Sequence, residues 1–346
     1  MMPARPLISF CLFAFEQEQY VEEAVAGALA QTYSPLEIVI SDDGSSDATF
    51  EAIERAVRDY AGPHRIVLSR NERNLGLGAH VNRVLGELAQ GEWFVMAAGD
   101  DVSLPDRVER IWNAIAQDST ARMVHSAVTR VDEKGAVLGT VPAPLLDLER
   151  AIRECIHGAT AAYHREVVDR CGPIDPIVRF EDRVLAFRAL LLGTSVAIDP
   201  PLVRWRRHGN NLSGRLGTGA VDQVAFSLGE FERMKLLASI QKLRDLLALD
   251  AGLRARILDV PGVEERLLAA IADEWRVSTY ARSYFFGEFA PRRLAADPRL
   301  RLLVWRKLAG AWLGERNRQP LSRGLLRLWR LTQRVRPSRR RASARP

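Results

Sequence analysis

Short apolar runs alternate with amphipathic stretches over the first two hundred residues of the chain. Four short runs rich in β-branched and other apolar residues are predicted to form strands: 7–13, 36–40, 65–68 and 92–98. Three stretches with apolar residues every three to four positions are predicted to form helices: 18–31, 48–60 and 78–90. Nearly continuous apolar strands that alternate with helices predict an α/β fold, with a mostly parallel sheet covered by helices on both faces.

The pattern changes along the rest of the chain. Residues 104–117 are predicted to form a helix and residues 121–135 a strand and turn. From Ala220 the periodicity is helical throughout, which predicts an appendage that packs on the core or makes a dimer. The chain is therefore predicted to divide into three parts: an α/β domain over 1–217, a helical appendage over 218–313 and an Arg-rich tail over 314–346.

Two pairs of aspartates come directly after predicted strands. Asp42 and Asp43 follow the second strand, and Asp100 and Asp101 follow the fourth. Because ligands bind beyond the carboxyl ends of the strands in such sheets, both pairs are expected to face one crevice. Loop composition explains a single acidic turn, but like charges brought together repel unless a cation or hydrogen-bond donors compensate them. A divalent metal that bridges carboxylates to a phosphorylated ligand is the economical compensation.

A third acidic pair, Glu181 and Asp182, opens an apolar stretch with helical periodicity. Adjacent helical residues point about 100° apart, so the two acids do not face one target. Asp182 shares its face with apolar residues, which makes it either a helix N-cap or a buried functional carboxylate with a shifted pKa. Spacing alone favours the N-cap.

A strand-like run after Pro201 ends in four basic residues: Arg204, Arg206, Arg207 and His208. Such a cluster suits the diphosphate of a ligand. It equally suits a solvated edge strand, where charged residues prevent sheet-to-sheet pairing. The residues alone leave both interpretations open.

Composition limits the classes of protein that fit. The 346 residues are 47% hydrophobic, which is enough for a substantial core. No run reaches the roughly 18 apolar residues of a membrane span, and the first residues lack a signal-peptide layout, so the protein is expected in the cytoplasm. Three cysteines without CxxC spacing are expected to be reduced. The chain has no GxxxxGK[ST] motif, and the glycines of its GLGAH segment, at 76–80, do not follow a first strand, which disfavours P-loop and dinucleotide-binding enzymes.

Positive charge is concentrated at the end of the chain. The net charge is +6, but residues 314–346 contain eleven arginines and one glutamate, so the remainder is acidic. Leucines and Trp329 among these arginines suit a helix on an anionic membrane surface. A solvated helix ending in a disordered basic tail fits equally well. Nucleic acid is disfavoured as a partner because no interleaved aromatic platform accompanies the charge.

Four blocks of sequence, in order, resemble those of the family 2 inverting glycosyltransferases with the GT-A fold: FAFEQEQYVEEAVAGALAQTYSPLEIVISDDGSSDAT, NLGLGAHVNRVLGELAQGEWFVMAAGDDVSLPDRV, FEDRVLAFRAL and WRRHGNNLS. Together they extend over about the first 215 residues. The resemblance implies a Rossmann-like sheet flanked by helices and an enzyme that uses a nucleotide-diphosphate sugar. Two positions depart from the family pattern: Phe15-Glu16 replaces the usual Tyr-Asn, and Gly99-Asp100-Asp101 replaces Asp-x-Asp.

The resemblance also implies roles for the acidic turns. Asp42, Asp43 and Asp100 are expected to bind the nucleotide. Asp101 is expected to hold a divalent metal, Mn²⁺ or Mg²⁺, with His208 as a further ligand.

The remaining roles concern the reaction. Asp182 matches the acid of the family's ED motif and is expected to be the general base, and Arg204 and Arg207 are expected at the diphosphate. The expected donor is a UDP-sugar, and the expected acceptor is a hydroxyl of a cell-envelope, lipid-linked or polysaccharide glycan. The tail would hold the protein peripherally on the inner face of the plasma membrane, and the appendage offers a route to an oligomer.

A second class of function remains open at this stage. The chain is alternatively a nucleotide-sugar-binding or scaffold protein that kept the fold without turnover. Glu16 and the altered acidic element are the features that point this way.

Overall fold

The computed structural model describes residues 4–154, 156–209 and 211, together with helical stretches at 234–235, 237–242, 244–250, 252, 265–266 and 268–269. The strands of this part of the chain are β1 (Ile8–Ala14), β2 (Leu36–Asp42), β3 (Arg65–Arg70), β4 (Trp93–Ala98), β5 (Val102–Ser103), β6 (Ala121–Val131), β7 (Val137–Val141), β8 (Ala162–His164) and β9 (Thr194–Arg206). The helices are α1 (Val21–Leu29), α2 (Thr49–Val57), α3 (Leu77–Arg83), α4 (Arg107–Gln117), α5 (Leu148–Arg153), α6 (Glu166–Asp169) and α7 (Glu181–Leu192), with a π-helical turn at Val84–Leu88 and a 3-10 turn at Gly158–Thr160.

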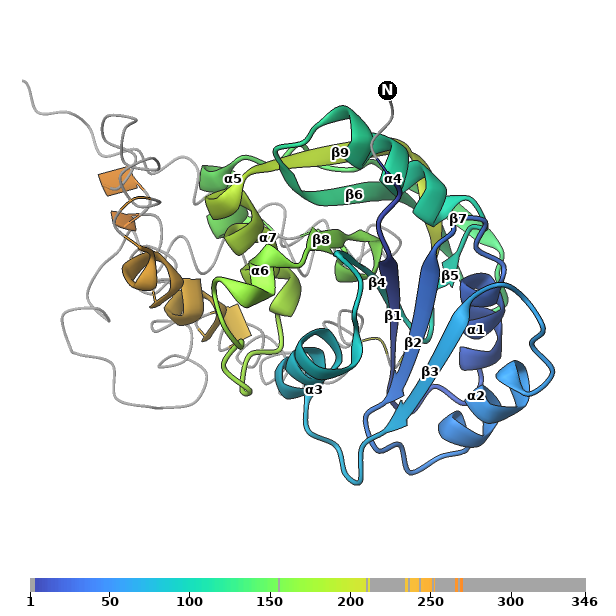
Figure 1. Cartoon of the computed structure of the whole chain (residues 1–346). Helices are drawn as coiled ribbons and strands as arrows, with labels where there is room; N and C mark the ends of the chain where they lie inside the picture. The colour runs from blue at the N-terminus through green and yellow to red at the C-terminus, as the bar shows by residue number, and fades with distance from the viewer. Residues whose placement is uncertain are drawn as a thin grey trace, which may run out of the picture.

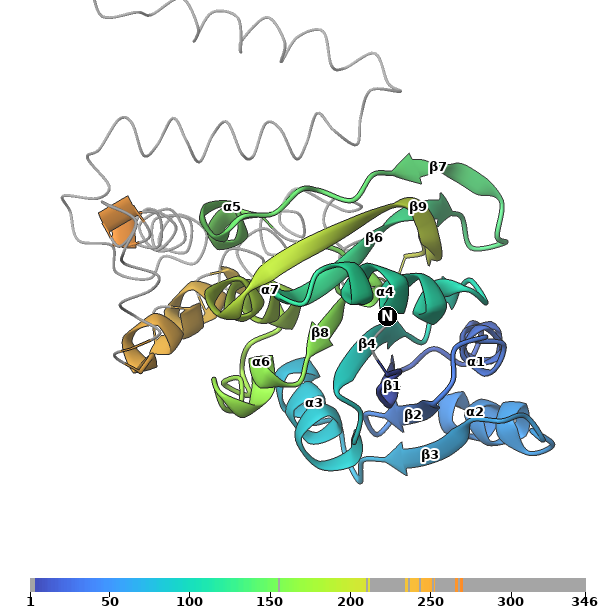
Figure 2. The ribbon, with the colours of Figure 1, turned by 45° about the horizontal axis from the view of Figure 1, so that its top comes forward.

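The strands form one curled sheet in the order β3-β2-β1-β4-β8-β6-β9-β5, with β7 paired to β6 (Figures 1 and 2). The first four strands are parallel, as the sequence predicts. The other half is mixed: β8 is antiparallel to both β4 and β6, β9 is parallel to β6, and β5 is antiparallel to β9. The α/β class is confirmed, and the description as mostly parallel holds for one half of the sheet.

The central strand β1 shows how the sheet is buried on both faces. Ile8, Phe10 and Leu12 belong to an apolar cluster with residues of α1, α2 and α4, whereas Cys11 belongs to a second cluster with residues of α3 and α7. Successive side chains of a strand point to opposite faces, so an unbroken apolar run fills both layers. Figure 1 shows α1 and α2 on one side of β1–β3 and α3 on the other.

The carboxyl end of β1 holds both acidic turns. The carbonyl of Phe13 accepts a hydrogen bond from Gly99 N–H at 2.8 Å, and the carbonyl of Ala14 accepts one from Asp43 N–H at 2.9 Å. β2 and β4 flank β1 on its two sides, so the turns that follow these strands meet at one edge of the sheet. This is the edge that the order of strands and acidic turns predicts.

The described part of the appendage packs against α7, where Figures 1 and 2 show the gold helical residues beside α6 and α7. Arg188 of α7 and Asp245 form an ion pair at 2.8 Å with side chains only 1% and 3% exposed. Ala238 joins the apolar cluster around α3 and α7, and Leu246 packs with Phe187 in a smaller cluster. This stretch of the appendage is therefore part of the core.

Other expectations concern regions that the structure describes in part. Cys11 and Cys171 are free thiols, as predicted, and Cys155 lies outside the described residues. No helix of the described residues is long and apolar enough to cross a membrane. The boundary at 217, the tail over 314–346 and most of the appendage lie outside the described residues.

We expect Asp245→Ala to destabilise the protein by about 3–5 kcal/mol, because it leaves the buried Arg188 guanidinium without its carboxylate. Urea unfolding measures this change in the free energy of unfolding. The control is Asp250→Ala, which removes an exposed ion pair to Arg170 and is expected to cost about 0–1 kcal/mol. Equal losses in the two variants would contradict a structural role for the buried pair.

Candidate active site

The first acidic turn is closed by its own loop. Asp42, the last residue of β2, accepts hydrogen bonds from the N–H of Ser45 at 3.0 Å and from its hydroxyl. Its carboxylate also lies 3.5 Å from the Arg70 guanidinium. Asp42 is fully buried, so these donors replace the water that would otherwise solvate it.

Asp43 organises the next loop along this edge. Its carboxylate accepts hydrogen bonds from the Asn71 side chain at 2.6 Å and from the N–H groups of Leu75 and Gly76, each at 3.0 Å. Gly76 has φ of +81°, a conformation that glycine adopts without strain. Asp43 therefore shapes the loop that leads into α3, and the structure buries both acids of the first turn.

The second acidic turn is tied to β9. Asp101 accepts a hydrogen bond from the backbone N–H of Arg206 at 2.9 Å and is 8% exposed. The Arg206 guanidinium, also buried, donates to the Asp100 carbonyl at 3.3 Å and to Glu23 at 2.5 Å, and it lies over the Tyr20 ring. Arg206 thus binds β9, α1 and the acidic turn into one unit.

Burial raises the pKa of Asp101 well above its ordinary value, and the neighbouring Asp100 raises it further. The Arg206 N–H and the cations of Arg107 and Arg206 oppose this shift. Arg107 is itself fully buried and donates to Met96 O and Ser103 Oγ, each at 2.8 Å. Burial lowers the pKa of Arg107 to about 9, with Asp101 acting in the opposite direction.

Asp100 is the acid at which distant blocks of sequence meet. One of its oxygens, Oδ2, lies 3.0 Å from His208 Nε2 and accepts a hydrogen bond from the Asn211 side chain at 3.0 Å. The Tyr20 ring packs on the imidazole with a centroid distance of 4.6 Å. The Asp100 and His208 side chains are 12% and 5% exposed. The sequence pairs His208 with Asp101, whereas the contact in the structure is with Asp100.

This pair of side chains fits a divalent cation that is completed by its ligand. A carboxylate oxygen and an imidazole nitrogen are suitable donors for Mn²⁺ and related metals. No group of three or more His, Cys, Asp or Glu side chains able to hold a metal occurs among the described residues. The fit is therefore to an ion that also uses substrate phosphates, as Mg²⁺ commonly does.

The third acidic pair lies in the first turn of α7. The N-cap residue is Phe180, without a side-chain capping bond, so the N-cap interpretation of Asp182 is wrong. Asp182 accepts a hydrogen bond from Arg183 N–H at 2.8 Å. A Cβ on Gly158 would lie 3.2 Å from Asp182 Cβ, so the 3-10 turn closes tightly over this acid. Asp182 is the buried carboxylate that the sequence offers as the alternative to a cap.

Burial raises the pKa of Asp182 to about 6, against the opposing charges of Arg183 and Lys242. Burial raises the pKa of Glu181 well above its ordinary value, and the Asp182 charge adds to this shift. The Tyr163 hydroxyl is buried, is influenced by both acids and has no hydrogen-bond partner among the described residues. With a pKa of about 6, Asp182 ionises near neutral pH.

The two arginines expected at the diphosphate have different surroundings. Arg204 is exposed on β9, opposite Val102 and Thr129 in the register. Arg207 places its guanidinium over the Trp205 ring at 4.6 Å, and its N–H donates to Val131 O. Trp205 in turn contacts the His157 ring at 3.9 Å. Arg206, between them, contacts both aspartates of the second acidic turn.

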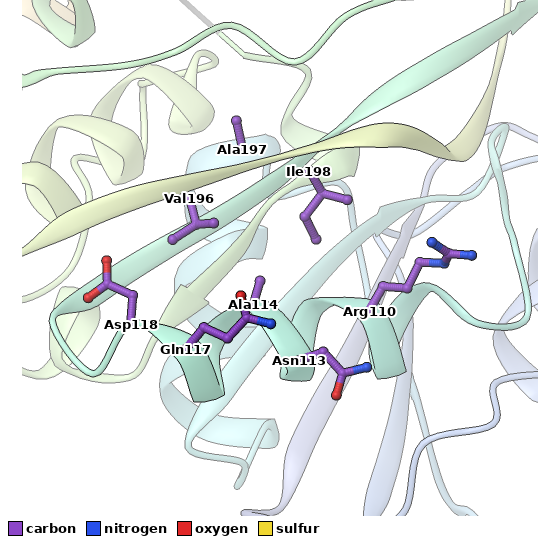
Figure 3. A pocket seen from close by; sticks show the side chains of 8 residues that line it. All are labelled: Arg110, Asn113, Ala114, Gln117, Asp118, Val196, Ala197 and Ile198. Atoms are coloured by element: carbon purple, nitrogen blue, oxygen red, sulfur yellow. The ribbon is translucent and has the colours of Figure 1, made fainter. Parts of the chain in front are cut away.

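A surface pocket of about 500 Å³ lies elsewhere, between α4 and the first half of β9 (Figure 3). Its lining comprises Arg110, Asn113, Ala114, Gln117, Asp118, Val196, Ala197 and Ile198. None of the predicted site residues is among them. The chemistry of the acidic edge, and not the size of this pocket, identifies the candidate site.

Sequence reasoning missed several residues of the site. Asn211 stands in the WRRHGNNLS block, which offered a signal for it. Arg206 had the same signal as its neighbours Arg204 and Arg207, and the run does not distinguish them. Arg107 and Lys242 lie in helical stretches whose pattern gives no sign of their burial.

The α/β sheet brings two acidic turns to one edge, and comparisons with known proteins bear on the class of this domain. Residues 9–171 match the model of glycosyl transferase family 2. An uncharacterised glycosyltransferase of Haemophilus influenzae is 30% identical over 129 residues, which cover 37% of this chain and 39% of that protein. The chain thus spans less than half the length of this relative.

Solved structures confirm the GT-A fold. The crystal structure of S. aureus TarS 1–349 in complex with UDP-GlcNAc superposes with a TM-score of 0.56 at 17% identity, over 95% of this chain and 93% of that one. The mannosyltransferase PcManGT from Pyrobaculum calidifontis, in complex with GDP-Man and Mn²⁺, gives a TM-score of 0.50 at 19% identity, over 89% and 86% of the two chains.

We expect Asp182→Asn to gain stability relative to the wild type as pH rises from about 4 to 6. The pKa of about 6 in the folded protein exceeds the ordinary 3.8, so the folded state holds this proton more tightly than the unfolded state. The stability that this proton confers is complete below pH 4 and is lost as pH rises through 6, with a total of about 3 kcal/mol. Thermal unfolding of both proteins from pH 4 to 8 measures the difference, and a pH-independent difference would contradict the raised pKa.

Proposed function

We propose that the protein is a metal-dependent inverting glycosyltransferase that moves a sugar from a nucleotide-diphosphate donor to an acceptor hydroxyl. The observation that carries this proposal is the contact of Asp100 with His208 and Asn211 at the edge where both acidic turns meet. The match of residues 9–171 to the model of glycosyl transferase family 2 supports the reaction class. The acceptor hydroxyl is proposed to belong to a polysaccharide, lipid-linked or cell-envelope glycan.

We assign the metal to Asp100 and His208, in place of Asp101 and His208. Asp101 is buried, and one of its oxygens accepts a hydrogen bond from Arg206 N–H. Burial also raises the pKa of Asp101, so the charged form that binds a metal is disfavoured. Asp100 is the more exposed of the two and already faces the imidazole. The Mn²⁺ in the PcManGT complex supports the use of a divalent ion on this fold. Mn²⁺ and Mg²⁺ are both compatible with this donor set.

The roles of the first acidic turn follow from its burial. Asp42 and Asp43 already accept bonds from the protein, so we propose that they support the nucleotide by fixing the loops at 43–49 and 71–76. The exposed Arg204 and the stacked Arg207 remain proposed contacts for the diphosphate. TarS binds UDP-GlcNAc and PcManGT binds GDP-Man, so the fold accepts more than one base, and UDP is the donor base we would test first.

The proposed reaction is a single displacement at the anomeric carbon. The acceptor oxygen forms a bond to this carbon as the bond to the diphosphate oxygen breaks, which inverts the configuration. Asp182 takes the acceptor proton, and a pKa of about 6 leaves it ionised at neutral pH yet basic enough to help. A bound divalent cation would offset the charge that develops on the departing nucleoside diphosphate.

We expect UDP, GDP or dTDP to bind in the presence of Mn²⁺ or Mg²⁺ and to lose binding when a chelator is added, as measured by calorimetric titration. Asp100→Asn and His208→Ala should each weaken this binding by at least about tenfold, because each removes a metal ligand. Asp101→Asn should retain it, since the amide oxygen still accepts from Arg206 N–H.

Arg110→Ala, in the pocket between α4 and β9, is the control and should bind normally. Loss of binding in Asp101→Asn with full binding in Asp100→Asn would overturn the assignment of the metal to Asp100. Absence of binding under every condition would favour a scaffold protein.

We expect Asp182→Asn to lower kcat by roughly 10²–10⁴-fold, the usual contribution of a well-placed general base. Metal-supported nucleotide binding should be unchanged in this variant. Measuring the release of nucleoside diphosphate reports turnover, and calorimetric titration reports nucleotide binding, so the two measurements separate a loss of catalysis from a loss of binding. Full activity in Asp182→Asn would remove it from the mechanism.

A further inference from the structure

We infer that Lys242 of the appendage is a positioning residue for Asp182, holding a fixed positive charge against the acid at the start of α7. This inference gives the proposed general base a partner outside residues 9–171, the part of the chain that matches the family. It rests on the proposed function for its catalytic meaning, whereas the pairing itself is independent of turnover.

The ammonium of Lys242 is held in a defined place. The side chain is fully buried, and Nζ donates to the carbonyls of Ala151 at 3.0 Å and Ile152 at 2.9 Å, in the last turn of α5. The Arg183 guanidinium donates to the same Ile152 carbonyl at 3.2 Å. The end of α5 therefore gathers two cations beside the first turn of α7, and carbonyls at a helix C-terminus favour positive charge.

The backbone of the appendage is clamped to α7 close to this lysine. Asp245 pairs with Arg188 through two hydrogen bonds of 2.8 and 2.9 Å, and Gln241 donates to Asp245 at 2.8 Å. The Lys242 Nζ also lies 5.9 Å from the ring centroid of Phe187. Since Phe187 and Arg188 belong to the same helix as Asp182, these contacts hold the ammonium against α7.

Four groups act on the Asp182 charge from the elements around it. Glu181 and Arg183 come from α7, Tyr163 from β8 and Lys242 from the appendage. Burial raises the pKa of Glu181 well above its ordinary value, and the Asp182 charge raises it further. Arg183 and Lys242 are the cations that keep the pKa of Asp182 from rising further. A lysine at this place keeps a buried base ionised at neutral pH.

A double-mutant cycle tests the pairing without reference to activity. Thermal unfolding of the full chain is measured for the wild type, Lys242→Met, Asp182→Asn and the double variant at pH 8 and pH 5. At pH 8 we expect Lys242→Met to lower Tm more in the wild type than in the Asp182→Asn background. At pH 5, below the Asp182 pKa of about 6, this excess should vanish. An equal loss in both backgrounds at both pH values would overturn the inference.

The pH profile of turnover tests the consequence. Turnover is measured with Mn²⁺ as the release of UDP from UDP-GlcNAc or of GDP from GDP-Man. In Lys242→Met we expect the acid limb of the pH–rate profile to shift upward by about one pH unit, so that activity is lost at low pH. Lys242→Arg keeps the charge and should restore the profile, and the exposed Arg244→Met on the same helix should leave it unchanged. A uniform loss at all pH values in Lys242→Met would overturn the inference. If the wild type turns over neither donor, the proposed function fails on these donors while the double-mutant cycle still decides the pairing.

Discussion

The structure depends on one constraint: several carboxylates are brought to one side of a sheet, and each must be compensated without water. Asp42 and Asp43 receive loop N–H groups and side-chain donors, and Asp101 receives the N–H of Arg206. An uncompensated buried carboxylate would cost several kcal/mol. Most of the acidic edge therefore serves to fix loops. Asp100 is the least buried of the four, and its carboxylate contacts the side chains of His208 and Asn211 instead of loop N–H groups.

The geometry of this edge follows from its strands. β1 carries one acidic turn on each of its last two carbonyls, so the two turns keep a fixed separation. β9 then approaches from the mixed half of the sheet and pins the second turn through Arg206. His208 follows directly after this strand. A residue distant in sequence thus reaches Asp100 because a strand delivers it.

The sequence predicts the parallel half well because its strands have a local signature. The runs at 7–13 and 36–40 correspond to β1 and β2, with differences of one or two residues at the ends. β9 is harder, since Pro200 and Pro201 interrupt it; its two parts pair with β6 across a shift in register. The pairing of β8 between β4 and β6 is likewise a long-range contact that no local pattern predicts.

The candidate site shows the same division between local and long-range information. Its acids are visible in the sequence because they follow strands or open a helix. Which acid of a pair is free is not visible, since adjacent aspartates have the same composition and differ only in their partners. Arg206 decides between Asp100 and Asp101, and Phe180 takes the N-cap that spacing assigns to Asp182. Both outcomes depend on how separate elements pack.

The region that matches the family ends at residue 171, yet the proposed chemistry needs residues beyond it. Asp182 lies on α7, and His208 and Asn211 follow β9. α7 in turn is clamped by Asp245, so its first turn is held by contacts from the appendage as well as from the sheet. The part of the chain that matches the family holds both aspartate pairs that follow strands, whereas the proposed base and the side chains that contact Asp100 come from the part beyond it. Substitutions in α7 or in the appendage residues that contact it would therefore change the surroundings of Asp182, and substitutions just after β9 would change those of Asp100.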